Sequence, residues 1–242
     1  MNFKIAIPTH WRADIIKQKT LSLIKDLWAE ITIFANPCWE KGKYYQFLWK
    51  EFNIVEIPTF TTMGKLRNDI LDYYNEWDKI LMLDDDVSKI YKLCFKNGKP
   101  NKEEISTNEF LELIEQWFGM CESIWYKLRG VNSSQNPLCM KNVIKYDKFI
   151  DWTFLWIIKS KLRFDDQINN KEDYDFTIQN VKAYWGAIRF DRICTDNKYL
   201  ATKWGLQNSP RTQEKDIVRL DMKWGKIIKR NPKKAEEIFI RL

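Results

Sequence analysis

Short apolar runs alternate with amphipathic stretches along the first third of this 242-residue chain. Such runs, bounded by turn residues, are typical of buried strands, and apolar residues three or four positions apart are typical of helices. Strands and helices that alternate at this spacing predict a parallel sheet covered on both faces. We expect strands at 3–7, 31–35, 54–57 and 80–83, and helices at 15–28, 40–52 and 63–74.

The second half is less regular, and the fold class we predict is α/β, with a mixed, mainly parallel sheet flanked by helices. We place this main domain at residues 1–210 and a basic, helical C-terminal extension packed on it at residues 211–242. We expect a turn at 97–101, helices at 107–120 and 174–184, strands at 152–159 and 187–194, and a long loop at 196–213.

Three consecutive carboxylates, Asp84, Asp85 and Asp86, end the fourth expected strand. Like charges this close disfavour joint ionisation, and a bound cation removes that cost. Successive side chains of an extended segment alternate in direction, so Asp84 and Asp86 share one side. Carboxylate oxygens suit Mg²⁺ or Mn²⁺. The alternative is that these residues form only a turn or a helix cap.

Other polar groups are expected at the same edge of the sheet, because ligands of such sheets bind beyond the carboxyl ends of the strands. The candidates are Thr9 and Arg12 after the first strand, Lys65, Arg67 and Asn68 in the third helix, Glu172 and Asp173, and Lys203, Trp204, Gly205 and Gln207 in the late loop. Plainer interpretations remain open: His10 as a turn residue, Lys65 and Arg67 as a solvated face, and Glu172 and Asp173 as charges that favour a helix start.

The positive charge is concentrated at the C-terminal end. Residues 211–242 contain ten Lys or Arg and five Asp or Glu, and the whole chain has a net charge of +7. This balance favours an anionic partner. The five cysteines are scattered without a CxxC pair, which favours reduced thiols and a cytoplasmic setting. The longest apolar stretch, 152–158, is too short to span a membrane, so we expect no membrane partner.

The order of these motifs resembles that of GT-A glycosyltransferases. Ile-Pro-Thr-x-x-Arg follows the first strand, Arg-Asn-Asp lies in a middle helix, and Leu-Asp-Asp-Asp and Glu-Asp-Tyr-Asp-Phe come later, so that the resemblance spans roughly residues 3–195. Ile-Pro-Thr-His-Trp-Arg and Gly-Lys-Leu-Arg-Asn-Asp are most similar to the TET-associated glycosyltransferases, phage-type enzymes that add sugars to 5-hydroxymethylpyrimidines in DNA. The resemblance implies a GT-A-type, Rossmann-like fold, a nucleotide-diphosphate sugar as donor, with a UDP-sugar expected, and Mn²⁺ or Mg²⁺ held by an Asp-x-Asp motif. If the chain is phage-encoded, it would act in the host cytoplasm.

The resemblance also implies roles for individual residues. Thr9 and Arg12 would hold the nucleotide base and ribose, and Lys65, Arg67 and Asn68 would face the diphosphate or the donor sugar. Asp84 would lie near the ribose, Asp85 near the sugar, and Asp86 would bind the metal with Asp84 beside it. Glu172 and Asp173 match the acidic motif near the acceptor, with Asp173 as the general base of an inverting reaction.

Two further expectations concern the metal and the acceptor. Many GT-A enzymes supply a late histidine to the metal, but His10 is the only histidine here, so water, Asp196 or Asn197 would complete the shell. A DNA acceptor fits the basic tail, where Lys223, Lys226, Lys229, Arg230, Lys233 and Lys234 with Trp224 would follow the phosphates. The alternative is an amphipathic helix that packs Ile227, Ile228, Ile238 and Phe239 against the domain.

Other functions share parts of this pattern. A glycosyltransferase that acts on polysaccharide or protein would have the same donor site without salt-dependent DNA binding. A two-metal nuclease or a non-catalytic DNA-binding protein would also suit the acids and the basic charge. A sugar nucleotidyltransferase needs a glycine-rich loop after the first strand, and residues 8–12 contain no glycine.

Overall fold

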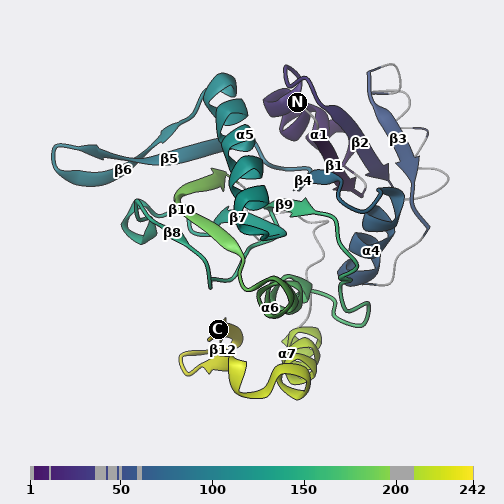
Figure 1. The fold of residues 1–242 in the computed structure, drawn as a ribbon, viewed down its shortest axis with the longest axis vertical. Coiled ribbons are helices and arrows are strands. Elements are labelled where there is room, and N and C mark those ends of the chain that lie inside the picture. The colour runs from purple at the N-terminus through teal and green to yellow at the C-terminus, as the bar shows by residue number, and fades with distance from the viewer. Residues whose placement is uncertain are drawn as a thin grey trace.

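The chain has an α/β fold built on one large mixed sheet, which helices cover on both faces (Figure 1). A computed structural model describes residues 3–10, 12–35, 42, 48, 51–58, 62–196 and 210–241. The strands of this sheet are β1 (Lys4–Thr9), β2 (Glu30–Ala35), β3 (Asn53–Glu56), β4 (Lys79–Leu83), β5 (Lys89–Lys96), β6 (Lys99–Glu104), β7 (Leu128–Asn132), β8 (Ile144–Lys145), β9 (Phe154–Ile158) and β10 (Ile188–Asp196).

Across the sheet the strands run in the order β3-β2-β1-β4-β9-β7-β10-β5-β6, and β8 pairs with β10. The first four in this order are parallel, as the alternation of strands and helices predicts. β9 is antiparallel to both β4 and β7, whereas β7 and β10 are parallel. The antiparallel pair β5 and β6 forms a hairpin that projects from the body (Figure 1).

The helices are α1 (Ala13–Gln18), α2 (Thr20–Ile24), α4 (Met63–Tyr73), α5 (Thr107–Ile124), α6 (Glu172–Tyr184) and α7 (Pro210–Trp224). Alternate residues of the central strands pack on opposite faces. Ile5 and Leu81 lie in a core with α1, α2 and α5. Ala6 and Met82 lie in a second core with α4 and α6. Among the described residues, no helix is both long and apolar enough to cross a membrane.

A C-terminal unit, residues 210–241, consists of α7, a short 3-10 turn (Gly225–Ile227) and the antiparallel hairpin of β11 (Ile228–Asn231) and β12 (Lys234–Ile240). It lies against α6 (Figure 1), where Ile178 of α6 packs with Ile217, Leu220 and Ile238. The prediction of a helical extension is therefore wrong for residues 228–240, and the predicted loop at 196–213 is wrong for 210–213, which lie in α7. Pro232 marks the hairpin turn, where a proline cannot continue a helix.

Three further differences from the predictions have local causes. The helix expected at 15–28 is two short helices, because the backbone leaves the helical conformation at Lys19. Glu172 and Asp173 lie inside the first turn of α6 rather than ahead of it. The buried strand β7 was not predicted, since Arg129 and Gly130 interrupt its apolar pattern. Most of the helix expected at 40–52 lies outside the described residues.

Candidate active site

The sheet brings two acidic segments to one edge. β1 and β4 are parallel, so Thr9, the last residue of β1, and the Asp84–Asp86 turn that follows β4 lie on the same side. β9 is antiparallel to β4 and begins opposite its last residue, with Phe154 beside Leu83. The segment before β9, which includes Asp151, therefore meets the turn after β4, and the Asp84 backbone N–H donates to the Thr153 carbonyl oxygen at 3.2 Å.

Asp85 is the anchored member of the three aspartates. Thr9 Oγ1 donates to its Oδ2 at 2.8 Å, and Arg12 Nη1 donates to its Oδ1 at 2.8 Å. Burial raises the pKa of Asp85, while Arg12 and the hydrogen bond from Thr9 oppose that rise. Arg12 Nη1 also lies 3.5 Å from Asp86. Thr9 and Arg12 therefore fix the acidic turn to β1.

Thr20 fixes the same turn from the other side. Its hydroxyl donates to the Asp84 carbonyl oxygen at 2.7 Å and accepts from the Val87 N–H at 3.0 Å. The side chain is fully buried. Thr20 was missing from the predicted site, and only its position as a polar residue in an apolar helix pattern distinguishes it in the sequence.

Arg67 of α4 lies between the Asp84–Asp86 turn and Glu172 of α6. Its Nη2 is 3.6 Å from Asp84 Oδ1, and its Nε is 4.0 Å from Glu172 Oε1. The guanidinium carbon lies 3.4 Å from the centre of the Trp152 ring. The side chain is 1% exposed, and among the described residues its Nε and Nη1 atoms have no hydrogen-bond partner. Arg67 is thus a buried cation with donors to spare.

Burial shifts the protonation of this cluster. It lowers the pKa of Arg67 to about 10, against the opposing field of Asp84 and Glu172. It raises the pKa of Asp84 to about 7, with Arg67 opposing and the neighbouring aspartates adding to the rise. The Asp84 side chain is still 34% exposed, so this carboxylate reaches solvent from a dense protein surrounding.

Glu172 and Asp173 form a pair of buried carboxylates in the first turn of α6. Burial raises the pKa of Glu172 to about 7, although Arg67 opposes it. Burial and the charge of Glu172 raise the pKa of Asp173 well above its ordinary value. Glu172 can therefore exchange a proton near neutral pH, which a general base requires.

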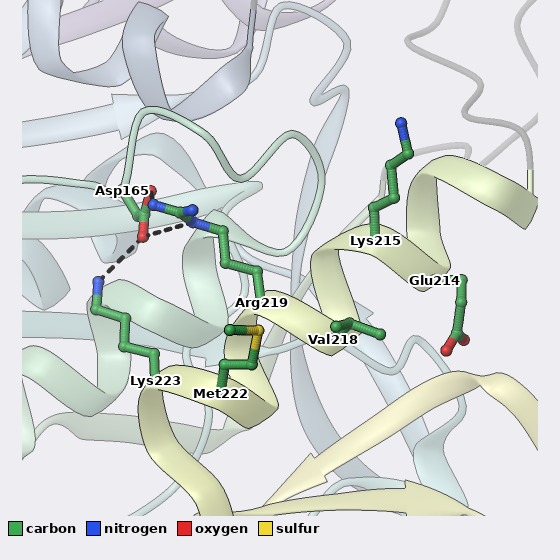
Figure 2. Close-up of a pocket in the computed structure, with 7 residues that line it drawn as sticks. All are labelled: Asp165, Glu214, Lys215, Val218, Arg219, Met222 and Lys223. Carbon is green, nitrogen blue, oxygen red and sulfur yellow. Dashed lines mark hydrogen bonds and ion pairs between the residues drawn. The ribbon is translucent and has the colours of Figure 1, made fainter.

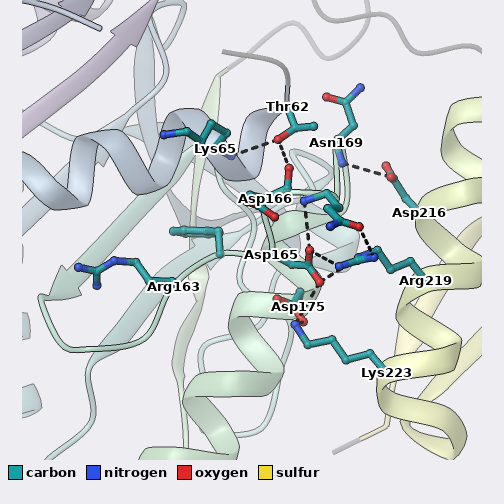
Figure 3. A network of polar contacts seen from close by, with 12 residues as sticks. Thr62, Lys65, Arg163, Asp165, Asp166, Asn169, Asp175, Asp216, Arg219 and Lys223 are labelled. Atoms are coloured by element: carbon teal, nitrogen blue, oxygen red, sulfur yellow. Dashed lines mark hydrogen bonds and ion pairs between the residues drawn. The ribbon is translucent and has the colours of Figure 1, made fainter. Parts of the chain in front are cut away.

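Asn68 and Lys65 of α4, which were predicted to face the diphosphate or the donor sugar, have partners within the protein. Asn68 donates from Nδ2 to the Phe164 carbonyl oxygen at 3.0 Å and accepts from the Phe164 N–H at 2.9 Å, so its amide holds a loop. The exposed Lys65 pairs with Asp69 of the same helix. The Lys65 backbone N–H donates to the helix cap Thr62 (Figure 3). Of Lys65, Arg67 and Asn68, Arg67 is the residue that lies beside Asp84 and Glu172.

Asp196 lies at the same edge, at the end of β10. Its Oδ2 accepts from the Ser88 hydroxyl at 3.3 Å, just after the acidic turn. Trp11, Asn197 and the predicted loop residues Lys203, Trp204, Gly205 and Gln207 lie outside the described residues. Asp151 and Trp152 were absent from the predicted site, because nothing in a local pattern joins them to Arg67.

A separate pocket of about 560 Å³ lies along α7 (Figure 2), and none of the predicted catalytic or donor-binding residues lines it. Its floor combines the apolar Val218 and Met222 with charged side chains. Arg219 and Lys223 turn toward Asp165 in this view. The pocket therefore belongs to the contact between the C-terminal unit and the main fold.

The family model described as TET-Associated Glycosyltransferase matches residues 3–205, which include both acidic segments and Arg67. No curated protein sequence matches the chain. Among solved structures, a protein assigned as a nucleotide-diphospho-sugar transferase from Desulfovibrio desulfuricans G20 is 8% identical with a TM-score of 0.43, covering 77% of this chain and 78% of that chain. A 4-diphosphocytidyl-2C-methyl-D-erythritol synthase from Anaerococcus prevotii DSM 20548 is 13% identical with a TM-score of 0.39, covering 72% of this chain and 83% of that chain.

Proposed function

The chain belongs to the TET-associated glycosyltransferase family, and from this premise we propose that it moves a sugar from a nucleotide-diphosphate donor to 5-hydroxymethylcytosine, or another 5-hydroxymethylpyrimidine, in DNA. Family membership makes the chain a glycosyltransferase. The donor, the metal, the acceptor and the roles of individual residues are the proposal.

The observation that carries the proposal is the placement of Arg67. A buried guanidinium whose Nε and Nη1 atoms lack partners among the described residues is costly unless a ligand or a bound water supplies acceptor oxygens. Arg67 lies between Asp84, proposed for the donor, and Glu172, proposed for the acceptor. A diphosphate oxygen bound here would satisfy the cation and place the donor sugar beside the acidic pair. Such fixed charge also stabilises the negative charge that develops on a departing diphosphate.

The carboxylates suit a hard divalent cation. Among the described residues, no group of three or more Asp, Glu, His or Cys side chains is arranged to hold a metal ion. Mg²⁺ is commonly bound by one or two carboxylates together with substrate phosphates and water, which fits Asp86 and Asp84 at the edge of the sheet. When bound, Mn²⁺ or Mg²⁺ would neutralise part of the diphosphate charge.

Proton transfer is assigned to the acidic pair. Of the two acids, Glu172 is the one that pairs with Arg67, so Arg67 favours the ionised form of Glu172. Burial and the neighbouring charge of Glu172 raise the pKa of Asp173, so once ionised its carboxylate binds a proton more strongly than an ordinary aspartate does. We assign Asp173 as the base that takes the proton from the hydroxymethyl oxygen as that oxygen attacks the anomeric carbon. Glu172 would stay ionised and offset the positive charge of Arg67.

The C-terminal unit offers cations for DNA, although fewer than the sequence indicates. Arg230 pairs with Glu214, Lys234 with Glu237, and Lys223 with Asp175. Lys226, Lys229 and Lys233 are exposed, and we propose that they contact the DNA phosphates. The target base would leave the helix to reach the donor site, as in other enzymes that act on a base.

The test combines the protein with Mn²⁺, a panel of nucleotide sugars, and either hydroxymethylcytosine DNA or the same DNA with unmodified cytosine. Nucleosides released by digestion are then weighed by mass spectrometry. We expect one donor to give a hexosyl or pentosyl adduct on hydroxymethylcytosine only, and a chelator to abolish it. Modification of oligosaccharide or peptide acceptors instead would reject the DNA acceptor. Cleaved DNA without an adduct would support the nuclease alternative.

A further inference from the structure

The first turn of α6 carries the proposed catalytic pair without a cap of its own. Its N-cap residue, Lys171, makes no side-chain hydrogen bond to the helix. Glu172, Asp173 and Asp175 are all buried in this turn. Closely packed carboxylates repel one another, so the turn needs contacts from outside the helix to hold its position.

Asp216 of α7 supplies those contacts just before the pair. Its Oδ1 accepts from the Asn169 N–H at 3.2 Å, and its Oδ2 accepts from the Asn170 N–H at 2.8 Å. The Asp216 side chain is buried. Figure 3 shows it directed from α7 toward Asn169. Both oxygens of one carboxylate thus hold the backbone immediately ahead of Lys171 and Glu172.

The C-terminal unit also holds the chain just after the pair. The Tyr174 hydroxyl donates to the Ile238 carbonyl oxygen of β12 at 3.2 Å. Trp224 Nε1 donates to Asp175 Oδ1 at 2.8 Å, and Lys223 Nζ lies 2.8 Å from the same oxygen. The two acids therefore lie between anchors at 169–170 and at 174–175, and all of these anchors come from the C-terminal unit.

Contacts farther along the loop make this attachment firm. Arg219 donates from Nε to Asp165 Oδ2 at 3.0 Å and from Nη1 to Gln167 Oε1 at 2.6 Å. Ile168 packs with Ile217 and Leu220 in an apolar core shared by the two parts. Gly64 of α4 touches the same loop, because a Cβ there would lie 2.2 Å from the Asp165 carbonyl oxygen. The loop at residues 165–168 is thus packed between α4 and α7.

We propose that the C-terminal unit positions Glu172 and Asp173 for the transfer reaction, with Asp216 as the main positioning residue. The inference rests on the proposed function, since it assumes that this pair meets the acceptor. It gives residues 210–241 a role at the catalytic acids that is independent of DNA binding. Asp216 acts through the backbone and does not touch the reacting atoms.

The experiment compares Asp216→Asn with Glu214→Gln. An asparagine keeps the shape of Asp216 but replaces one of the two accepting oxygens with an NH2 donor, so one of the two backbone N–H groups loses its acceptor. Glu214 lies on the same helix and pairs with the exposed Arg230, away from the 165–175 segment. We would measure kcat and KM for transfer, the pH dependence of kcat, UDP binding with Mn²⁺, and hydrogen exchange of the amides at 169–175.

We expect Asp216→Asn to lower kcat by about 10-fold to 100-fold, because small displacements of catalytic groups have effects of this size. UDP binding should stay within about twofold, which is far less than the effect of displacing a catalytic group. The reason is that Asp216 holds the backbone at Asn169 and Asn170 and not the Asp84–Asp86 turn. The pH profile should shift, and exchange at 169–175 should accelerate. Glu214→Gln should match the wild type in all four. Wild-type kcat and exchange in Asp216→Asn would overturn the inference, as would equal losses of UDP binding and kcat.

A second variant covers the case in which Asp216→Asn does not fold. Trp224→Phe keeps an aromatic ring and removes only the N–H that donates to Asp175. The same changes in kcat and exchange, at smaller size, would support the inference, and their absence would overturn it. If the wild type transfers no sugar, the proposed function fails, and exchange at 169–175 alone then decides whether the C-terminal unit orders the acids.

Discussion

Two arginines lie beneath the acidic edge of the sheet, and their surroundings differ sharply. Arg12 makes a 2.8 Å hydrogen bond to Asp85, which Thr9 also holds at 2.8 Å. Arg67 is more deeply buried, yet its charged neighbours lie at 3.6 Å and 4.0 Å, and its Nε and Nη1 atoms lack partners among the described residues.

Residues that hold the acidic turn in place are thus distinct from residues proposed to take part in the reaction, although both groups lie at the same edge of the sheet. A carboxylate whose hydrogen bonds are short and complete holds a turn in place and is costly to disturb. A buried cation with loosely placed neighbours keeps binding capacity for a ligand that is itself charged. The Arg12 side therefore holds the acidic turn in place, and the Arg67 side is where we propose that the donor and acceptor meet.

The largest expected effect is on the Arg67 side. Asp173→Asn should lower the rate of sugar transfer by about 10²-fold to 10⁴-fold, because an amide cannot accept the proton of the attacking hydroxyl. Initial rates on hydroxymethylcytosine DNA measure this. Asp72→Asn is the matched control, since Asp72 pairs with Arg163 at the surface. A residual rate above one tenth of the wild type would remove Asp173 from the role of base.

The corresponding change on the Arg12 side should act on stability. Thr9→Val keeps the shape of the side chain and removes the hydroxyl that donates to Asp85. We expect the free energy of unfolding to fall by about 1.5–3 kcal/mol, the usual range for a hydrogen bond to a charged group. Urea unfolding measures it, and an unchanged midpoint would show that the Asp85 anchor is not needed.

The carboxylates beside Arg67 should also make stability depend on pH. The pKa values of Asp84 and Glu172 are about 7 in the folded protein, against ordinary values of 3.8 and 4.5. The folded state therefore keeps protons that the unfolded state loses between about pH 4 and 7, so the free energy of unfolding should fall as pH rises through this window.

Urea unfolding of the protein without ligand at pH 5.5, 6.5 and 7.5 measures this slope. Glu172→Gln should flatten it and raise stability at pH 7.5, because the variant no longer carries a buried charge at that position. Glu214→Gln, which removes an exposed carboxylate, should leave it unchanged. Stability that rises across the window in the wild type would contradict the raised pKa values.

The smallest effect is expected far from both arginines. Changing Lys229 and Lys233 of the C-terminal hairpin to Gln should lower the salt dependence of DNA binding by about two units of the log–log slope, and weaken binding several-fold. The matched control changes Lys96 and Lys99, which are exposed on the hairpin of β5 and β6. Equal effects of both pairs would indicate non-specific attraction to a basic protein.

Sequence patterns predicted the Arg12 side better than the Arg67 side. Apolar runs located β1 and β4, and the positions of the residues near the ends of these strands followed from them. The Arg67 cluster joins α4, the segment before β9 and α6, which are distant in the chain, so no local pattern reveals that Arg67 stacks on Trp152. Asn68 lies next to Arg67 in sequence but faces Phe164, because adjacent helical residues point in different directions.

The C-terminal unit shows the same limit. Its helix was expected from spacing, whereas the hairpin of β11 and β12 was not, although Pro232 was a visible signal. Charge counting places Lys223 among the side chains that would follow DNA phosphates, but Lys223 pairs with Asp165 and Asp175. Which cation faces a partner and which faces solvent depends on tertiary contacts that charge counting does not include.

The most direct test of the account is the transfer rate of Arg67→Lys beside that of Thr9→Val, each corrected for the folded fraction and measured with saturating donor and Mn²⁺. Lysine keeps the charge but lacks the planar fork that can span Asp84 and Glu172 while stacking on Trp152. We predict a loss of about 100-fold or more for Arg67→Lys and a rate within about fivefold of the wild type for Thr9→Val, the smaller effect of one hydrogen bond outside the reacting groups. A near-wild-type rate for Arg67→Lys, or an equal loss in both variants, would contradict the central claim that the chemistry takes place around Arg67.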